Sequence, residues 1–236
     1  MRFFSYESKF SQLLMKLCYA CYLELLWVIC SLPIFTIGAS TTALYYCCLK
    51  IVREEDSHVG AMFFRAFREN FKQATVLWLI LLGLGIFLAT DGYILIHLRR
   101  TTEGPMAVIW TLILALVIGA AVLYTIELTN IFPLVASVRN TNIAMLKNAF
   151  LIGTHYLFAT ILVVLIHFAM FYLVVAVFTP LIVFGEGLCA LVSAWLLDRI
   201  LISVSGEREE ETAEDEESAA PEAPELPEDV QEGDAP

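Results

Sequence analysis

Long runs of apolar residues alternate with short polar segments along most of the chain. Three runs, at about 74–98, 105–129 and 155–179, are plainly long enough to cross a hydrocarbon layer about 30 Å thick, which takes about 20 apolar residues in a helix. Two further apolar regions, 12–52 and 181–202, are interrupted by proline or by charged residues. The pattern predicts an all-α fold, a polytopic bundle of transmembrane helices.

The region 12–52 has two interpretations, because Pro33 and Gly38 lie in its middle. Proline removes a backbone donor and glycine ends helices easily, so the helix is expected to break between them. The region is then either one crossing followed by an interfacial helix, or a hairpin with limbs at 12–32 and 39–52. In both cases 181–202 brings the chain back across the membrane after Pro180.

The positions of Lys and Arg favour the hairpin, because short cytoplasmic loops of membrane proteins are rich in these residues. With six crossings and both termini inside, 12 of the 14 basic residues lie on the inner side, and only Arg99 and Arg100 lie outside. With five crossings, Arg2, Lys9 and Lys16 also lie outside, which gives a split of 9 to 5. We therefore expect six crossings, with five as the alternative.

Composition and charge divide the chain into two parts. Hydrophobic residues make up 59% and charged residues 17%, whereas soluble domains are nearer half and a quarter. The net charge of −11 comes from residues 207–236, which hold 14 acidic residues and one Arg. We expect a transmembrane domain at 1–206 and a disordered acidic tail at 207–236. This apolar, near-neutral body excludes a soluble enzyme and a basic nucleic-acid-binding domain.

The clearest amphipathic element lies at 61–72, ahead of the first long apolar run. Four aromatic rings share one face of the predicted helix and three cations share the adjoining face. We expect an interfacial helix that continues into 74–98, with its rings at the acyl boundary and its cations among lipid headgroups. A docking surface for a cytoplasmic partner is the alternative. The residues are Phe63, Phe64, Phe67 and Phe71 on one face, and Arg65, Arg68 and Lys72 on the other.

Three carboxylates within the apolar runs are candidates for coupling or substrate binding: Glu24, Asp91 and Glu127. A charged side chain at the middle of a transmembrane helix costs about 2.5–3.5 kcal/mol, so each needs a reason. Glu24 is either a hydrogen-bonded group that locks the bundle or a carboxylate that couples to a proton or a substrate. The three carboxylates lie at different depths, and no catalytic or metal-binding motif is present. We therefore expect no catalytic residue, metal or cofactor.

Two motifs resemble a known family. The first is Leu26-Trp27 leading into Cys30-Ser31-Leu32-Pro33-Ile34-Phe35-Thr36-Ile37-Gly38 and Thr41-Thr42-Ala43-Leu44-Tyr45, and the second runs from Phe63 to Ala74 and on to Leu77-Trp78. In this order and spacing they resemble the YesL-like family (DUF624) of bacterial membrane proteins. The resemblance covers 24–82 and implies an uncharacterised protein of the bacterial plasma membrane. Members of the family come mostly from Gram-positive bacteria, and their genes often lie beside those for carbohydrate uptake and polysaccharide degradation.

Two functions from different classes follow. We expect a non-enzymatic accessory protein linked to carbohydrate uptake, whose partners are the lipid bilayer and a sugar ABC transporter or another membrane protein. It would act through its cytoplasmic faces at 50–72 and 133–150. The alternative is a small secondary transporter or channel with a midplane site near Glu24, because broken helices and buried carboxylates are what such sites use. The substrate and the oligomeric state are not readable from the sequence.

Overall fold

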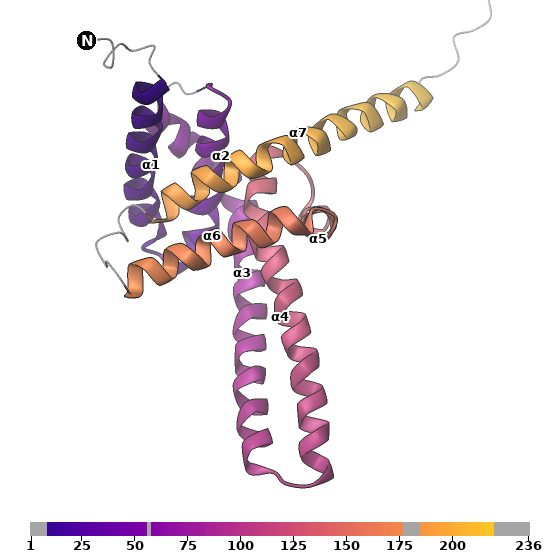
Figure 1. The fold of residues 1–236 in the computed structure, drawn as a ribbon. Helices are drawn as coiled ribbons and strands as arrows, with labels where there is room; N and C mark the ends of the chain where they lie inside the picture. The colour runs from indigo at the N-terminus through magenta and orange to yellow at the C-terminus, as the bar shows by residue number, and fades with distance from the viewer. Residues whose placement is uncertain (1–8, 56–57, 177–184, 220–236) are drawn as a thin grey trace, which may run out of the picture.

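The computed structural model describes residues 9–55, 58–176 and 185–219, and the elements within these ranges are all helical (Figure 1). The long helices α3 and α4 form a hairpin, and α6 and α7 run obliquely to it. Five helical segments of the described residues are long and apolar enough to cross a membrane, namely α1, η1 with α2, α3, α4 and α6. The predicted all-α membrane fold is therefore confirmed. In chain order the elements are α1 (Lys9–Ser31), η1 (Ile34–Thr36), α2 (Ile37–Val52), α3 (Val59–Thr101), α4 (Pro105–Ser137), α5 (Asn142–His155), α6 (Leu157–Ala176) and α7 (Gly185–Ala219).

The predicted sixth crossing at 181–202 is not among these five segments. Residues 181–184, like the turn expected at Pro180, lie outside the described residues. From Gly185 to Ile202 the helix α7 carries Glu186, Asp198 and Arg199, and these charges lower its apolar character. The described residues therefore contain five segments that meet the length and composition of a crossing, and the crossing at 181–202, which begins outside them, stays a prediction.

The region 12–52 forms the expected hairpin, in which α1 and α2 are antiparallel limbs on either side of Pro33. The Trp27 indole N–H donates to Thr41 Oγ1 at 3.0 Å, and the hydroxyls of Ser31 and Ser40 lie 2.6 Å apart. These hydrogen bonds join the two limbs in a setting where polar groups need partners within the protein. The single-crossing interpretation is thereby excluded, because α2 lies back along α1.

Gly38 does not break the helix, contrary to its predicted role. It lies inside α2 and is buried against α3. A Cβ atom at this position would lie 2.5 Å from Trp78 Cβ and 2.6 Å from the Ala74 carbonyl oxygen. Glycine is therefore needed for the close approach of two helices, while the break itself is made at Pro33 alone.

The end of α2 is a Schellman motif, in which backbone N–H groups beyond the helix satisfy its last carbonyls. The Glu55 N–H donates to the Lys50 carbonyl at 2.9 Å and the Glu54 N–H donates to the Ile51 carbonyl at 3.3 Å. Glu54 has a φ of 59°, in the left-handed region. This turn reverses the chain sharply enough for α3 to return along α2.

Helix α3 begins at Val59 and continues without a break to Thr101, as the predicted continuation of 61–72 into 74–98 required. The prediction that all four aromatic rings of this helix lie at the acyl boundary is wrong for three of them. Phe63 is fully buried in the protein core, and Phe67 and Phe71 pack against that core, whereas Phe64 is exposed. Because α2 packs along this part of α3, three of the four rings contact protein rather than the acyl boundary. The cations Arg65, Arg68 and Lys72 are at least partly exposed, as expected.

The turn at Pro33, between α1 and α2, and the turn between α3 and α4 lie at different positions along the length of α3. Six crossings with both termini inside would place both turns at the outer face of the membrane. The Trp78 indole N–H donates to the Ile34 carbonyl at 2.8 Å, so the first turn lies beside the middle of α3. Beyond Trp78, α3 continues to Thr101 for about 35 Å at 1.5 Å per residue. We call residues 79–123, which form this part of α3 and the facing part of α4, the distal hairpin. Hydropathy locates crossings along the sequence but not their relative heights. Apolar side chains cover the outside of the distal hairpin.

Helix α7 continues past residue 207 to Ala219, into the segment that was expected to be disordered. The expectation rested on the shortage of large apolar residues there. Glu and Ala are strong helix formers, however, and the next proline is Pro221, so a helix that is already nucleated can extend. Residues 220–236 lie outside the described residues.

Candidate functional site

Glu24 is the most deeply buried carboxylate of the described residues, with 1% of its surface exposed. Its Oε2 accepts the backbone N–H of Gly187 in the first turn of α7. The first N–H groups of a helix have no partner within the helix and favour a negative charge nearby. Gly187 also allows close packing, because a Cβ there would lie 2.5 Å from the Ala20 carbonyl oxygen. Glu24 therefore joins α1 to α7 through this hydrogen bond.

A cleft with a mostly apolar lining lies between α2, α4, α6 and α7, beside this contact. It has a volume of about 370 Å³. Hydroxyl groups and two titratable side chains occur among its lining residues, and apolar side chains complete it. The lining residues are Thr41, Tyr45, Thr125, Thr129, His167 and Glu186, with Leu128, Phe132, Val164 and Phe168.

The two titratable groups of the cleft face each other. Glu186 Oε1 lies 3.8 Å from His167 Nε2. The other ring nitrogen, His167 Nδ1, is 2.8 Å from the Val163 carbonyl oxygen. A carbonyl can only accept, so Nδ1 carries a proton and Nε2 faces the carboxylate. The pair can therefore hold a proton at a position that also contacts the cleft.

The three carboxylates predicted from the sequence do not form one site. Glu24 contacts Gly187, the residue after Glu186 of the cleft, but does not itself line the cleft. Glu127 neighbours Leu128 of the cleft, and one of its carboxylate oxygens is buried with no hydrogen-bond partner among the described residues. Asp91 belongs to the distal hairpin.

Sequence reasoning missed Glu186 and His167 as a pair. Glu186 lies near the turn expected at Pro180, and His167 lies in the middle of an apolar helix, which is typical of a core histidine. Nineteen positions separate them, and no local spacing signals the contact. The signal that could have found them is that each is an ionisable residue within an apolar run.

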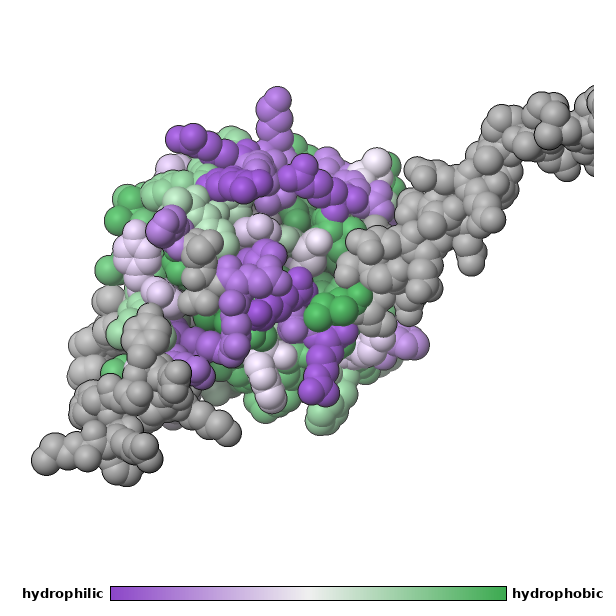
Figure 2. Space-filling model, turned by 90° about the horizontal axis from the view of Figure 1, so that it is seen from above, coloured by the Kyte–Doolittle hydropathy of each residue, from purple (hydrophilic) through white to green (hydrophobic). Residues whose placement is uncertain are grey.

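A charged surface covers the end of the molecule where α1 begins and α2 ends, and Figure 2 shows hydrophilic side chains gathered there. On its α3 side, Glu69 accepts from Arg65 and from Arg139, each at 2.9 Å. Lys50 pairs with Glu55, and this ammonium lowers the pKa of the Glu55 carboxyl. Of the basic residues predicted to share one side of the membrane, Arg65 and Arg139 therefore meet at one carboxylate.

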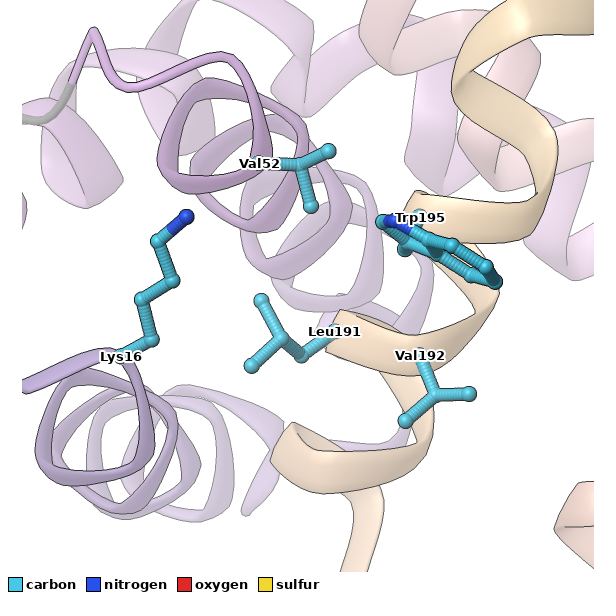
Figure 3. Close-up of a pocket in the computed structure, with 5 residues that line it drawn as sticks. All are labelled: Lys16, Val52, Leu191, Val192 and Trp195. Atoms are coloured by element: carbon cyan, nitrogen blue, oxygen red, sulfur yellow. The ribbon is translucent and has the colours of Figure 1, made fainter. Parts of the chain in front are cut away.

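A crevice of about 270 Å³ opens between α1, α2 and α7 (Figure 3). Lys16 lies on one side of it and Trp195 on the other, with Leu191 between them. Within the described ranges, no three His, Cys, Asp or Glu side chains come together in a way that could hold a metal ion.

The fold and the cleft define the class, a polytopic helical membrane protein with a mostly apolar cleft between its helices that two titratable side chains help to line. Residues 20–92 match a family model described as "Protein of unknown function, DUF624". The resemblance to the YesL-like family is thereby confirmed, and the matched region runs from α1 through α2 into α3. No curated protein and no solved structure matches the chain.

Proposed function

We propose that the protein is a non-enzymatic membrane protein that binds a small polar solute in the cleft between α2, α4, α6 and α7 and moves it with a proton. The observation that carries this proposal is the Glu186–His167 pair at the cleft. Ionisable groups inside a membrane protein are costly, and they commonly mark solute and proton pathways. The pair favours the transporter interpretation over the accessory one, with Glu186 rather than Glu24 as the coupling carboxylate.

The composition of the cleft suits a solute that forms hydrogen bonds. The hydroxyls of Thr125 and Thr129 donate to carbonyls of their own helix and can still accept from a solute. The Thr41 hydroxyl accepts from Trp27 and can still donate, and Phe132 and Phe168 offer flat apolar faces. Pockets for small molecules commonly combine a mostly apolar wall with a few placed polar groups. A proton shared by Glu186 and His167 would compensate the charge of the pair while the solute is bound.

The test uses proteoliposomes that contain a pH-sensitive dye and the purified full-length protein. A panel of monosaccharides, amino acids and carboxylates is added outside, and the internal pH is followed. We expect at least one solute to change it, and Glu186→Gln to abolish the change. Glu69→Gln, which alters a carboxylate of the charged surface on α3, is the matched control and should behave as the wild type. If no solute moves protons, or if Glu186→Gln is fully active, the proposal fails.

An accessory role in carbohydrate uptake is the second candidate. It is supported by the resemblance and by two surfaces that this chain leaves uncovered, namely the apolar distal hairpin and the cations Arg65 and Arg68. Pull-down from mild detergent should then recover a sugar ABC transporter subunit, and Arg68→Glu should weaken its recovery. Recovery of no transporter subunit would contradict this role. Solute movement by the purified protein alone would favour the first candidate.

We also propose that both termini face the cytoplasm of a bacterial cell, from the distribution of Lys and Arg. This orientation requires an even number of crossings, with α7 as the sixth. A cysteine placed at position 5 should resist a membrane-impermeant thiol reagent in intact cells, and one placed at position 103 should react. Because the chain contains six native cysteines, both variants are made in a background in which Cys18 is replaced by Ser, since Cys18 is exposed. The opposite labelling pattern would show that the termini face outward and that the proposed orientation is wrong.

A further inference from the structure

The crevice between α1, α2 and α7 is wedge-shaped. At its closed end the two outer helices touch, where Gly187 lies against the Ala20 carbonyl. One helical turn further along each helix, Lys16 and Leu191 are on opposite sides of the open space (Figure 3). The wedge therefore opens toward the charged end of the molecule, where Lys50 and Glu55 also lie.

The lining of the crevice has the chemistry of an amphiphile site. Val52, Leu191, Val192 and Trp195 supply an apolar wall, and Lys16 is the charged residue that lines it. A lysine can lay its methylene stem along an apolar surface and keep its ammonium at the boundary with water. The crevice therefore offers one cation above a hydrocarbon surface.

Lys16 is available to a further anion. It pairs with Glu54 at 3.6 Å, and the Glu54 side chain is 73% exposed, so the pair is loose and open to water. The ammonium has three donors, and one carboxylate oxygen does not occupy them all. The nearby Arg53 is engaged more tightly, since its Nε donates to Asp198 at 2.6 Å. Lys16, rather than Arg53, is therefore the cation that can bind a phosphate.

The surroundings favour a lipid as the occupant. Trp195 is 68% exposed, and tryptophan is enriched where transmembrane segments meet the headgroup region. Basic pockets between transmembrane helices bind anionic headgroups. The acidic run that begins at Glu207 is 12 residues from Trp195, about 18 Å along a helix, which exceeds the Debye length of about 8 Å at physiological salt.

We propose that this crevice binds one anionic phospholipid, with its phosphate on Lys16 and its glycerol and first methylenes against Leu191, Val192 and Val52. The lipid comes from the leaflet at the charged end of the molecule. It fills the wedge between α1 and α7 and thereby supports the contact that Glu24 and Gly187 make deeper in the bundle.

The test is native mass spectrometry of the full-length protein, released from nanodiscs that contain equal amounts of phosphatidylglycerol and phosphatidylcholine with identical acyl chains. We expect one phosphatidylglycerol to be retained preferentially. Lys16→Gln should lower its retention about fivefold, the loss expected for one cation near an anionic surface. Lys16→Arg should retain it, and Glu54→Gln should increase retention by freeing Lys16.

Two further variants separate binding in the crevice from general attraction of anionic lipid to the basic surface. Lys72→Gln removes a cation of α3 that does not line the crevice, and it should leave retention unchanged. Val192→Trp fills the crevice from its exposed rim and should reduce retention while leaving Lys16 in place. The proposal is overturned if phosphatidylcholine is retained equally, or if Lys16→Gln and Lys72→Gln have the same effect.

Discussion

Replacing Gly38 by alanine tests the packing of α2 on α3 most directly. The added methyl would lie 2.5 Å from Trp78 Cβ and 2.6 Å from the Ala74 carbonyl oxygen. Both atoms are held by the α3 backbone and cannot turn aside, so the two helices must separate by about 1 Å to restore ordinary contact. A gap of 0.5–1 Å loses about a quarter to a half of the dispersion energy of the facing atoms. Overpacking of this kind typically costs about 1–3 kcal/mol, and we expect Gly38→Ala to lie at the upper end.

Gly83→Ala is the matched control, because it is the same substitution inside a helix that also spans the membrane. A Cβ at Gly83 meets no atom within 4 Å. Only helix propensity then changes, and alanine should stabilise the protein by about 1 kcal/mol. For a chain of this size 1 kcal/mol corresponds to about 2–4 °C in Tm. We therefore expect Gly38→Ala to lower Tm by about 6–12 °C and Gly83→Ala to raise it by about 2–4 °C.

A thiol-reactive fluorogenic dye measures both transitions in detergent. Cys47 and Cys48 are fully buried in α2, so they react only when the helix leaves its contacts. Exposed Cys18 supplies a constant background. Equal midpoints for Gly38→Ala and Gly83→Ala would refute the close packing of α2 on α3, and with it the role assigned to Gly38.

Three further changes test other parts of the fold. Glu54→Gly should raise stability by about 1 kcal/mol, since glycine adopts the left-handed backbone of this position without strain, and a fall in Tm would contradict the Schellman motif. Asn130→Ala should destabilise by about 1–3 kcal/mol by leaving the Thr160 hydroxyl without the amide that donates to it at 3.2 Å; denaturation in mixed micelles measures this, with no change as the contrary result. A double-mutant cycle of Arg53→Gln and Asp198→Asn should give a coupling of about 1 kcal/mol or more, because this half-buried pair joins α2 to α7, whereas additive effects would show that it contributes nothing.

Several features of the fold follow from the sequence because they depend on neighbouring residues. Apolar runs of sufficient length predict the helices of 74–98, 105–129 and 155–179, since the bilayer requires backbone groups to be satisfied within each segment. The break at Pro33 follows from its missing N–H. The distribution of cations predicted the first hairpin, and the resemblance at 24–82 agrees with the family match at 20–92.

The positions of side chains relative to distant parts of the chain could not be predicted in this way. Phe63 shares a helix face with Phe64, yet it is buried while Phe64 is exposed, because α2 covers one side of that face. Gly38 looked like a helix terminator by residue type alone. Its close contact with Trp78 becomes visible only once α2 and α3 are packed together.

Local hydropathy and backbone chemistry were enough to predict the membrane class, the all-α fold, the first hairpin and the continuous helix through 61–98. Long-range packing, in contrast, established that Glu24 meets Gly187, 163 positions away, and that Glu186 faces His167 at the cleft. It also set the height of the first turn against the middle of α3. Such contacts depend on how well the surfaces of two helices fit and on whether buried polar groups find hydrogen-bond partners. Neither factor produces a periodic pattern in the sequence.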